Sequence, residues 1–250
     1  MIGIFDSGMG GLTVLTALRA QLPEADFLYY GDIKNAPYGV RSREELTELT
    51  VADIQFLQSH GATDIVSACN SVSASLAVSL LDALHLSTQH LVEMVGPTVA
   101  HFKDYDGRIA LAATPATISS GMYQSAFHMI GKDVMPIPIP PLAGAIEAGA
   151  PADEIEGILT EAFLKAPPVY DTLILACTHY PLTVETFKKI LGSTVRVFNP
   201  AEVVAERAAT LFGTQEGSGK ISFYISKDSM PFRALVESLF SASPRTIEVV

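Results

Sequence analysis

Two cysteines each end an apolar run and are followed at once by polar side chains. Cys177 lies in ILACTHYPL (174–182), before a threonine and a histidine, and Cys69 lies in SACNSVSA (67–74), before an asparagine and a serine. A thiolate is a nucleophile and a base that a nearby imidazole or helix start can stabilise. The two segments therefore predict thiol chemistry, although a lone cysteine in a reducing compartment is more often an inert buried thiol.

Small polar residues also follow other predicted strands. In an open parallel sheet, ligands bind beyond the carboxyl ends of the strands, so we expect these residues to gather at one edge. They are Asp6 with Ser7 and Gly8, Asp32, Cys69 with Asn70 and Ser71, Thr114 with Thr117, and Cys177 with Thr178 and His179. Taken singly, the aspartates and threonines are explained as helix caps or turn residues. Together with two cysteines and a histidine, they favour one shared site.

The elements that must position these residues follow an α/β pattern, because short apolar runs alternate with segments of helical period. The predicted strands are IGIF, DFLYYG, TDIVSA, HLVEMV, RIALAA, DVMPIPI, DTLILA, TVRVF and ISFYIS. One helix is well defined, since Ser42 and Glu45 have capping-box spacing and Gly61 follows its end. Its predicted buried face consists of Leu46, Leu49, Ala52 and Phe56.

Internal similarity suggests two related halves. TDIVSACNSVSA (63–74) and DTLILACTHYPL (171–182) share an acid, an apolar strand and Ala-Cys, and IGIFDSGMGG (2–11) similarly matches RIALAATPATISSG (108–121). We expect the chain to cross between halves near Gly96-Pro97 and to return near Asn199-Pro200. The expected first domain is residues 1–96 plus 200–250, and the expected second domain is residues 97–199.

Composition and charge exclude several classes of function. The chain has 250 residues, of which 48% are hydrophobic and 17% charged, as in compact globular proteins. A net charge of −11, with no long run of Lys or Arg, argues against nucleic-acid binding. No apolar stretch approaches the ~18 residues of a membrane span. The start MIGIF does not resemble a signal peptide, so we expect a cytoplasmic protein.

Binding sites for cofactors fit the sequence poorly. Gly8, Gly10 and Asp32 match parts of a dinucleotide site, but Thr13 takes the third glycine position and Asp6 would repel a pyrophosphate. GSGK (217–220) has the wrong glycine spacing for a phosphate loop, and the histidines form no metal-binding motif. We therefore expect no cofactor and no metal.

Two cysteines on separate strands also narrow the type of thiol chemistry. Redox pairs usually lie at one helix start with two residues between the thiols. A cysteine hydrolase would use one thiol and leave the other without function. Symmetric placement suits the inversion of a tetrahedral carbon, in which one group removes a proton from one face and the other returns a proton to the opposite face.

The sequence resembles the glutamate racemases of the cofactor-independent aspartate/glutamate racemase family over most of its length. The matching segments are IGIFDSGMGGLTVL, YYGDIKNAPYGVRS, SACNSVSA, AATPATISSGMYQ, AIEAG and LILACTHYPL. The resemblance implies two pseudo-symmetric α/β domains with the active site in the cleft between them. It also implies interconversion of L- and D-glutamate for peptidoglycan synthesis. Aspartate racemase, or a related two-cysteine racemase, stays an alternative, and a non-catalytic ligand-binding relative is another.

Roles for single residues follow from the same resemblance. It implies that Cys69 and Cys177 form the acid/base pair, with Cys69 acting on the D form and Cys177 on the L form. It implies Asp6 as the acid beside the first thiol, and His179 with Glu147 beside the second. The expected substrate contacts are Asp6, Ser7, Tyr38, Gly39, Asn70, Ser71, Thr114, Thr117, Thr178 and His179.

Three segments depart from the family pattern. The family's CNTATA is CNSVSA here, which keeps a hydroxyl at Ser71. Gly96 precedes Pro97 where the family has glutamate, and Asn199 stands where an acid is expected. The last two changes do not touch the thiols, so they bear on substrate preference, regulation or assembly. We expect a small-molecule substrate and no nucleic-acid or membrane partner, and a homodimer is compatible with the sequence.

Overall fold

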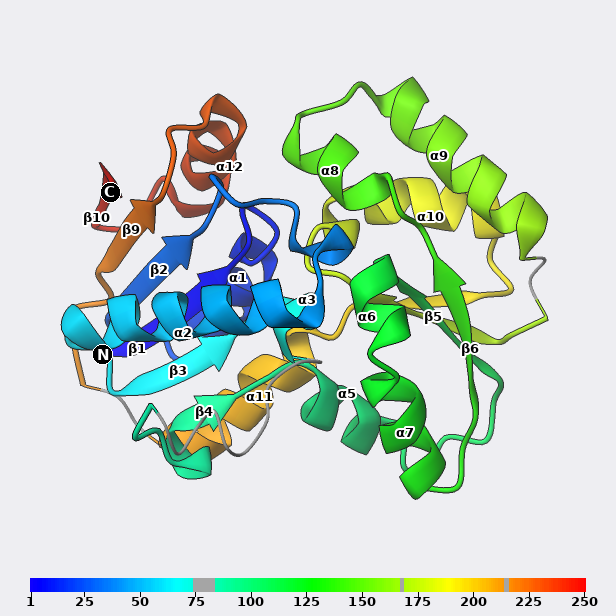
Figure 1. Cartoon of the computed structure of the whole chain (residues 1–250), viewed down its shortest axis with the longest axis horizontal. Helices are drawn as coiled ribbons and strands as arrows, with labels where there is room; N and C mark the ends of the chain where they lie inside the picture. The colour runs from blue at the N-terminus through cyan, green and yellow to red at the C-terminus, as the bar shows by residue number, and fades with distance from the viewer. Residues whose placement is uncertain (74–83, 167–168, 214–215) are drawn as a thin grey trace.

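The computed structural model describes residues 1–73, 84–166, 169–213 and 216–250, and its strands form two parallel sheets (Figure 1). The strands of the first sheet are β1 (Ile2–Asp6), β2 (Phe27–Gly31), β3 (Asp64–Ser67), β4 (Leu91–Val92), β9 (Ile221–Ile225) and β10 (Arg245–Val249). Those of the second are β5 (Ile109–Ala113), β6 (Val134–Pro138), β7 (Thr172–Ala176) and β8 (Arg196–Phe198). The sheet orders are β10-β9-β2-β1-β3-β4 and β6-β5-β7-β8.

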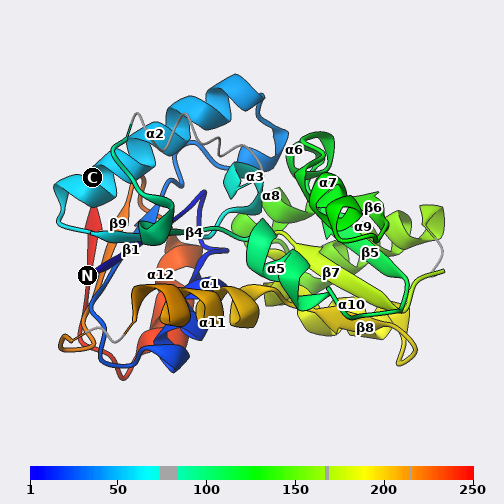
Figure 2. The ribbon, with the colours of Figure 1, turned by 90° about the horizontal axis from the view of Figure 1, so that it is seen from below.

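Helices cover both faces of each sheet (Figure 2). The α-helices are α1 (Leu12–Gln21), α2 (Arg43–Ser59), α3 (Asn70–Ser73), α5 (Val95–His101), α6 (Pro115–Ser119), α7 (Met122–Met129), α8 (Leu142–Glu147), α9 (Ala152–Lys165), α10 (Val184–Leu191), α11 (Ala201–Phe212) and α12 (Met230–Phe240). Short 3₁₀ helices are η1 (Tyr38–Val40), η2 (Thr88–His90) and η3 (Tyr180–Thr183). In the first sheet α2 covers one face, and α1, α11 and α12 cover the other (Figure 2).

Alternating side chains of the strands build the core on the two faces of each sheet. Ile4 of β1 belongs to the cluster that contains Leu15 of α1, whereas the next residue, Phe5, packs in the cluster of Leu57 on α2. Most strand residues are buried, as expected for parallel sheets covered on both sides. Among the described strands, β6 pairs only with β5, and it carries Pro136 at its middle and Pro138 at its end, which suits an edge position.

The strand order of the second sheet repeats within the first. The order β2-β1-β3-β4 corresponds to β6-β5-β7-β8, and all of these pairs are parallel. Cys69 follows β3 and Cys177 follows β7, which are corresponding strands. The predicted fold class, mainly parallel sheets flanked by helices, is confirmed. The boundaries at residues 96–97 and 199–200 stay a proposal, which the separation of strands into residues 2–92 plus 221–249 and residues 109–198 supports.

The predicted helix after Ser42 has the expected start but a different buried face. The capping box of Ser42 and Glu45 is present, with both hydrogen bonds formed. Ala52 is exposed, and the predicted face is therefore partly wrong. The buried residues of α2 are Leu46, Thr50, Asp53, Ile54 and Leu57. The strand β10 was not predicted, because its side chains are exposed or half-buried and lack an apolar run.

Gly96 and Asn199, which depart from the family pattern at the two expected crossings between halves, lie at or near the starts of helices. Gly96 and Pro97 lie inside α5, where the Glu93 carboxylate accepts hydrogen bonds from the backbone N–H groups of Val95 and Gly96. Asn199 Oδ1 accepts from the N–H of Ala201 at the start of α11, which an acid in this position would also do. Across the described residues, no helix has the length and apolarity that a membrane crossing requires.

Candidate active site

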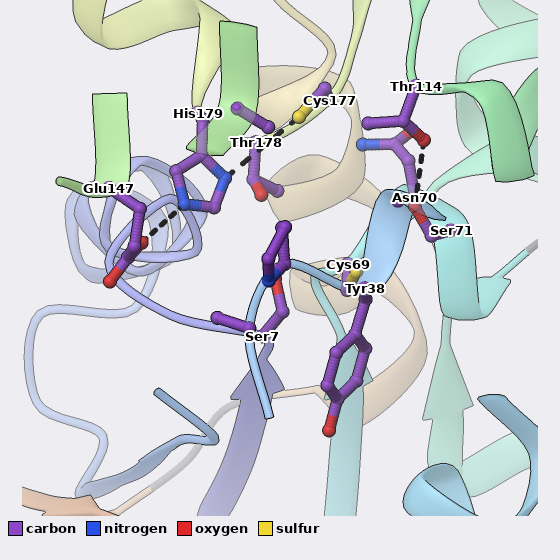
Figure 3. A pocket seen from close by; sticks show the side chains of 14 residues that line it. Ser7, Tyr38, Cys69, Asn70, Ser71, Thr114, Glu147, Cys177, Thr178 and His179 are labelled. Atoms are coloured by element: carbon purple, nitrogen blue, oxygen red, sulfur yellow. Dashed lines mark hydrogen bonds and ion pairs between the residues drawn. The ribbon is translucent and has the colours of Figure 1, made fainter. Parts of the chain in front are cut away.

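A pocket lies where strand ends of the two sheets meet (Figure 3). It is lined by Ser7, Ala36, Pro37, Tyr38, Gly39, Cys69, Asn70, Ser71, Thr114, Ala143, Glu147, Cys177, Thr178 and His179. Of the residues predicted as catalytic groups or substrate contacts, Asp6 and Thr117 do not line it, and neither do Gly8 and Asp32, which were expected at the same edge. The cavity is about 10 Å³, close to the least space that holds one water molecule. An amino acid therefore requires its walls to move apart.

Each sheet contributes one thiol to this pocket. Phe5 of β1 pairs with Ser67 of β3, so the loops after these strands leave the first sheet together, and Cys69 is 5% exposed. Burial raises the pKa of the Cys69 thiol, and the nearby Asp6 raises it further, while backbone N–H groups of Val72 and Ser71 offset part of the effect. The raised pKa favours the protonated form of the Cys69 thiol.

Cys177 lies at the end of a hydrogen-bonded row of side chains that come from the loop after β7 and from α8 (Figure 3). Its Sγ is 3.9 Å from His179 Nδ1, and His179 Nε2 is 2.5 Å from Glu147 Oε2. Burial by itself lowers the pKa of His179, but the interactions with Cys177 and Glu147 outweigh burial and raise it well above the ordinary value. A protonated imidazole beside Cys177 is the kind of cation that stabilises a thiolate.

Asp6 lies behind the pocket wall and connects the two halves. Its Oδ2 accepts hydrogen bonds from the N–H groups of Gly8 and Gly11, and its Oδ1 accepts from Thr178 Oγ1 at 3.0 Å. Burial raises the pKa of Asp6, although the charge of His179 and the hydrogen bonds lower it in part. The predicted role of Asp6 as the acid beside Cys69 stays a prediction, and the structure shows a carboxyl group that orders the loop after β1.

The glycines of the loop after β1 permit a close approach to the second half. A Cβ atom on Gly8 would overlap the Glu147 carboxylate, and one on Gly10 would lie 2.5 Å from His179 Nδ1. These glycines therefore have a packing reason that does not involve a pyrophosphate. The backbone of the GSGK segment likewise binds a carboxylate of the protein itself, because the N–H groups of Ser218 and Lys220 donate to Asp26.

A cluster of hydroxyl groups joins α3 to α6 beside the pocket. Ser71 Oγ is 3.0 Å from Thr114 Oγ1, and Thr117 Oγ1 lies 3.3 Å from Ser71 Oγ and 3.0 Å from Thr114 Oγ1. Thr114 also caps α6 by accepting from the N–H of Thr117. Thr114 is thus both the predicted helix cap and part of the pocket wall. Thr117 does not line the pocket and instead contacts Thr114 from behind.

Asn70 presents a free donor to the pocket. Its Oδ1 accepts a hydrogen bond of 2.6 Å from the hydroxyl of Tyr123 on α7. Among the described residues, its buried Nδ2 has no hydrogen-bond partner. A buried donor without a partner is costly in a folded protein, so this group is suited to bind an acceptor on a ligand.

Tyr38 turns its hydroxyl away from the other labelled side chains of the pocket (Figure 3). The hydroxyl donates to Asp32 Oδ2 at 2.6 Å and is 3.0 Å from Asp53 Oδ2. The ring and backbone of Tyr38, together with Gly39, therefore form the wall, and the polar end is anchored in the first half.

The chain matches a known family model over most of its length. The Asp/Glu/Hydantoin racemase model covers residues 13–208. The chain belongs to this family. It is 37% identical over 224 residues to the glutamate racemase of Dinoroseobacter shibae, covering 83% of this chain and 82% of the relative. The glutamate racemase of Paracoccus denitrificans is 34% identical over 246 residues, which is 90% of each chain.

A solved member of the racemase family has the same fold. The glutamate racemase of Francisella tularensis, solved in complex with D-glutamate, superimposes with a TM-score of 0.87 over 100% of this chain and 96% of that one, at 27% identity. The predicted resemblance is thus confirmed.

Two racemase residues around the pocket were missed by sequence reasoning. Tyr123 lies in the matching segment AATPATISSGMYQ, but nothing in its spacing predicts its contact with Asn70. Asp53 lies within a helix whose face was predicted incorrectly. The available signal was the position of Asp53 between the apolar residues Ala52 and Ile54. Since a buried carboxyl group needs a partner, an aspartate in such a place indicates a specific contact.

Proposed function

We propose that this protein interconverts L- and D-glutamate without a cofactor, using Cys69 and Cys177 as a pair of acid/base groups. The observation that carries the proposal is that two buried thiols, one from each sheet, line one pocket. Inversion at the α-carbon needs groups on both faces of the substrate, and the repeated strand order supplies a thiol from each half. The similarity to glutamate racemases favours glutamate over aspartate.

The two thiols have different neighbours, since Cys177 lies beside His179 and Cys69 does not. In the L to D direction, the Cys177 thiolate removes the α-proton while the protonated His179 stabilises the thiolate. Cys69, whose pKa is raised by burial, then gives its proton to the opposite face. In the D to L direction the two cysteines exchange roles.

Polar groups of the pocket hold the charged ends of the amino acid. The free Nδ2 of Asn70 donates to a carboxylate oxygen of glutamate. Glu147 Oε1, which is buried and has no partner among the described residues, accepts from the ammonium group. Negative charge that develops at the α-carbon is stabilised by the hydroxyl of Ser71 and by backbone N–H groups in a closed cavity.

The wider setting of the reaction is part of the same proposal. D-glutamate made by this enzyme supplies peptidoglycan synthesis in the cytoplasm. A homodimer is also proposed, and light scattering after gel filtration tests it, since a mass near 26.7 kDa would indicate a monomer.

Deuterium exchange tests the reaction directly. Purified protein is incubated with L-glutamate, and separately with L-aspartate, in D₂O without pyridoxal phosphate or metal. We expect exchange of the α-proton and loss of optical rotation with glutamate, and much less with aspartate. A folded protein that exchanges neither substrate would refute the racemase function, and preference for aspartate would reassign the substrate.

Substitution of each thiol tests the two-base mechanism. Cys69→Ser and Cys177→Ser are each expected to lose racemisation, because a serine hydroxyl is a far weaker acid than a thiol. Full activity in either variant would end the assignment of that cysteine.

A further inference from the structure

The Tyr38 hydroxyl lies between two buried carboxyl groups behind the pocket wall. Asp32 and Asp53 are each 2% exposed, and their Oδ2 atoms are 2.6 and 3.0 Å from the hydroxyl oxygen. Asp32 comes from the loop after β2, whereas Asp53 comes from α2. Neither carboxyl group forms an ion pair among the described residues.

The single hydroxyl hydrogen of Tyr38 cannot form hydrogen bonds to two carboxylate anions at once. Tyr38 has one hydroxyl hydrogen, and the shorter distance assigns it to Asp32. Asp32 also accepts hydrogen bonds from Asn35 Nδ2 and Ser226 Oγ, so its oxygens are well supplied with donors. A second anionic oxygen facing the same hydroxyl oxygen would be repelled by it. The contact of Asp53 with Tyr38 is favourable only when Asp53 carries a proton.

We propose that Asp53 is a positioning residue that donates its proton to the Tyr38 hydroxyl, which in turn donates to Asp32, so that the relay fixes the Tyr38–Gly39 wall of the pocket. The inference rests on the proposed function, because that wall is taken to enclose glutamate. Asp53 does not contact the substrate and acts through Tyr38.

The surroundings of Asp53 keep the proton in place. Burial raises its pKa well above the ordinary value, and the negative charges of Asp32 and Asp6 add to the effect. Burial raises the pKa of Tyr30, and the charges of Asp32 and Asp53 raise it further, so this side chain stays neutral and adds no charge near Asp53. Burial and the neighbouring acidic groups outweigh the hydrogen bond with Tyr38, which by itself lowers the pKa of Asp53.

Loss of this proton at high pH loosens the wall. Two carboxylates would then compete for one hydroxyl hydrogen, and their repulsion would drive α2 and the loop after β2 apart. The Michaelis constant for glutamate rises as a result, whereas kcat changes less because the relay does not touch the thiols. The rise occurs over the pH range in which Asp53 loses its proton.

Kinetics as a function of pH test the relay. Asp53→Asn keeps a donor to Tyr38 but has no proton to lose, so we expect a near-normal KM that lacks the alkaline rise of the wild type. Asp53→Ala removes the donor, and we expect KM to increase roughly five- to thirty-fold at neutral pH, as for the loss of a buried hydrogen bond. An alkaline rise of KM that persists in Asp53→Asn would overturn the proposal.

Infrared spectroscopy tests the proton without any assay of activity. The wild type is expected to show a carbonyl stretching band of a protonated carboxyl group that disappears in Asp53→Asn. The matched control is Asp64→Asn, because Asp64 is also buried but binds His90, and this variant should retain the band. If Asp53→Asn removes no such band, the inference fails. An inactive wild type that shows the band would refute the proposed function alone.

Discussion

Replacing Tyr123 by phenylalanine should weaken glutamate binding by freeing the Asn70 amide. The hydroxyl of Tyr123 donates to Asn70 Oδ1 at 2.6 Å, and both side chains are buried. This hydrogen bond holds Nδ2 toward the pocket, where a substrate carboxylate would lie. Without it, the amide can rotate, and its buried oxygen loses a donor.

The size of the effect follows from the burial of the pair. Loss of a buried hydrogen bond costs about 0.5–1.5 kcal/mol, and leaving its acceptor without a partner costs about 1–3 kcal/mol. We therefore expect a loss of about 1–2 kcal/mol in substrate binding. Since each 1.4 kcal/mol corresponds to about tenfold, KM should rise roughly five- to thirty-fold.

Polarimetric racemisation assays over a range of glutamate concentrations separate KM from kcat. Tyr123→Phe should change kcat little, because Cys69 and Cys177 keep their positions. The matched control is Tyr170→Phe, since the buried Tyr170 hydroxyl has no hydrogen-bond partner within the described part of the chain. That variant should leave both constants unchanged.

Two outcomes would refute the reasoning. An unchanged KM in a folded Tyr123→Phe variant would show that Asn70 does not need this anchor. An equal increase in KM for Tyr170→Phe would show that loss of any buried hydroxyl perturbs the pocket, and not the specific contact with Asn70.

Three further predictions concern the row formed by Glu147 and His179. Glu147→Gln should lower the pKa of His179, which NMR titration of the imidazole measures, and an unchanged pKa would contradict the pairing. The same variant should reduce kcat/KM in both directions roughly hundredfold, which is the lower end of the usual contribution of acid/base groups. Because the raised pKa of His179 favours its protonated form in the folded state, the stability that Glu147 contributes should be full below pH 6.5 and should be lost as pH rises through the folded pKa. Urea unfolding of the wild type and Glu147→Gln at several pH values checks this sign, and a difference that grows with pH would oppose it. Gly8→Ala should push the Glu147 carboxylate away from His179 and lower kcat/KM by a similar factor. The control Gly157→Ala, whose added methyl group would meet nothing within 4 Å, should leave kcat/KM unchanged. Equal losses of kcat/KM in the two variants would refute the steric argument.

Local features of the chain were predictable because neighbouring residues create them. The capping box of α2 depends on Ser42 and Glu45, which are three residues apart, and both of its hydrogen bonds form. The two Ala-Cys segments similarly predicted strands that end at a thiol, since a buried parallel strand is recognisable as an apolar run. The repeat of these segments agrees with the repeated strand order.

Contacts between distant residues were not predictable in the same way. The buried face of α2 was predicted from hydrophobicity, and Asp53 was missed because its burial depends on Tyr38, fifteen residues earlier. The anchoring of Asn70 by Tyr123 spans 53 positions and links side chains from the two halves. Neither contact leaves a periodic pattern in the sequence.

The sequence by itself determined the fold class, the thiols and the loops that carry the polar groups, because apolar periodicity and residue type express these properties locally. Only the tertiary structure decided how those groups are oriented and charged. Asp6 accepts from Thr178 behind the pocket, Glu147 reaches His179, and Asp53 meets the hydroxyl of Tyr38. The physical reason is that burial and the distance to a partner set the protonation state of a side chain, and packing alone brings such partners together.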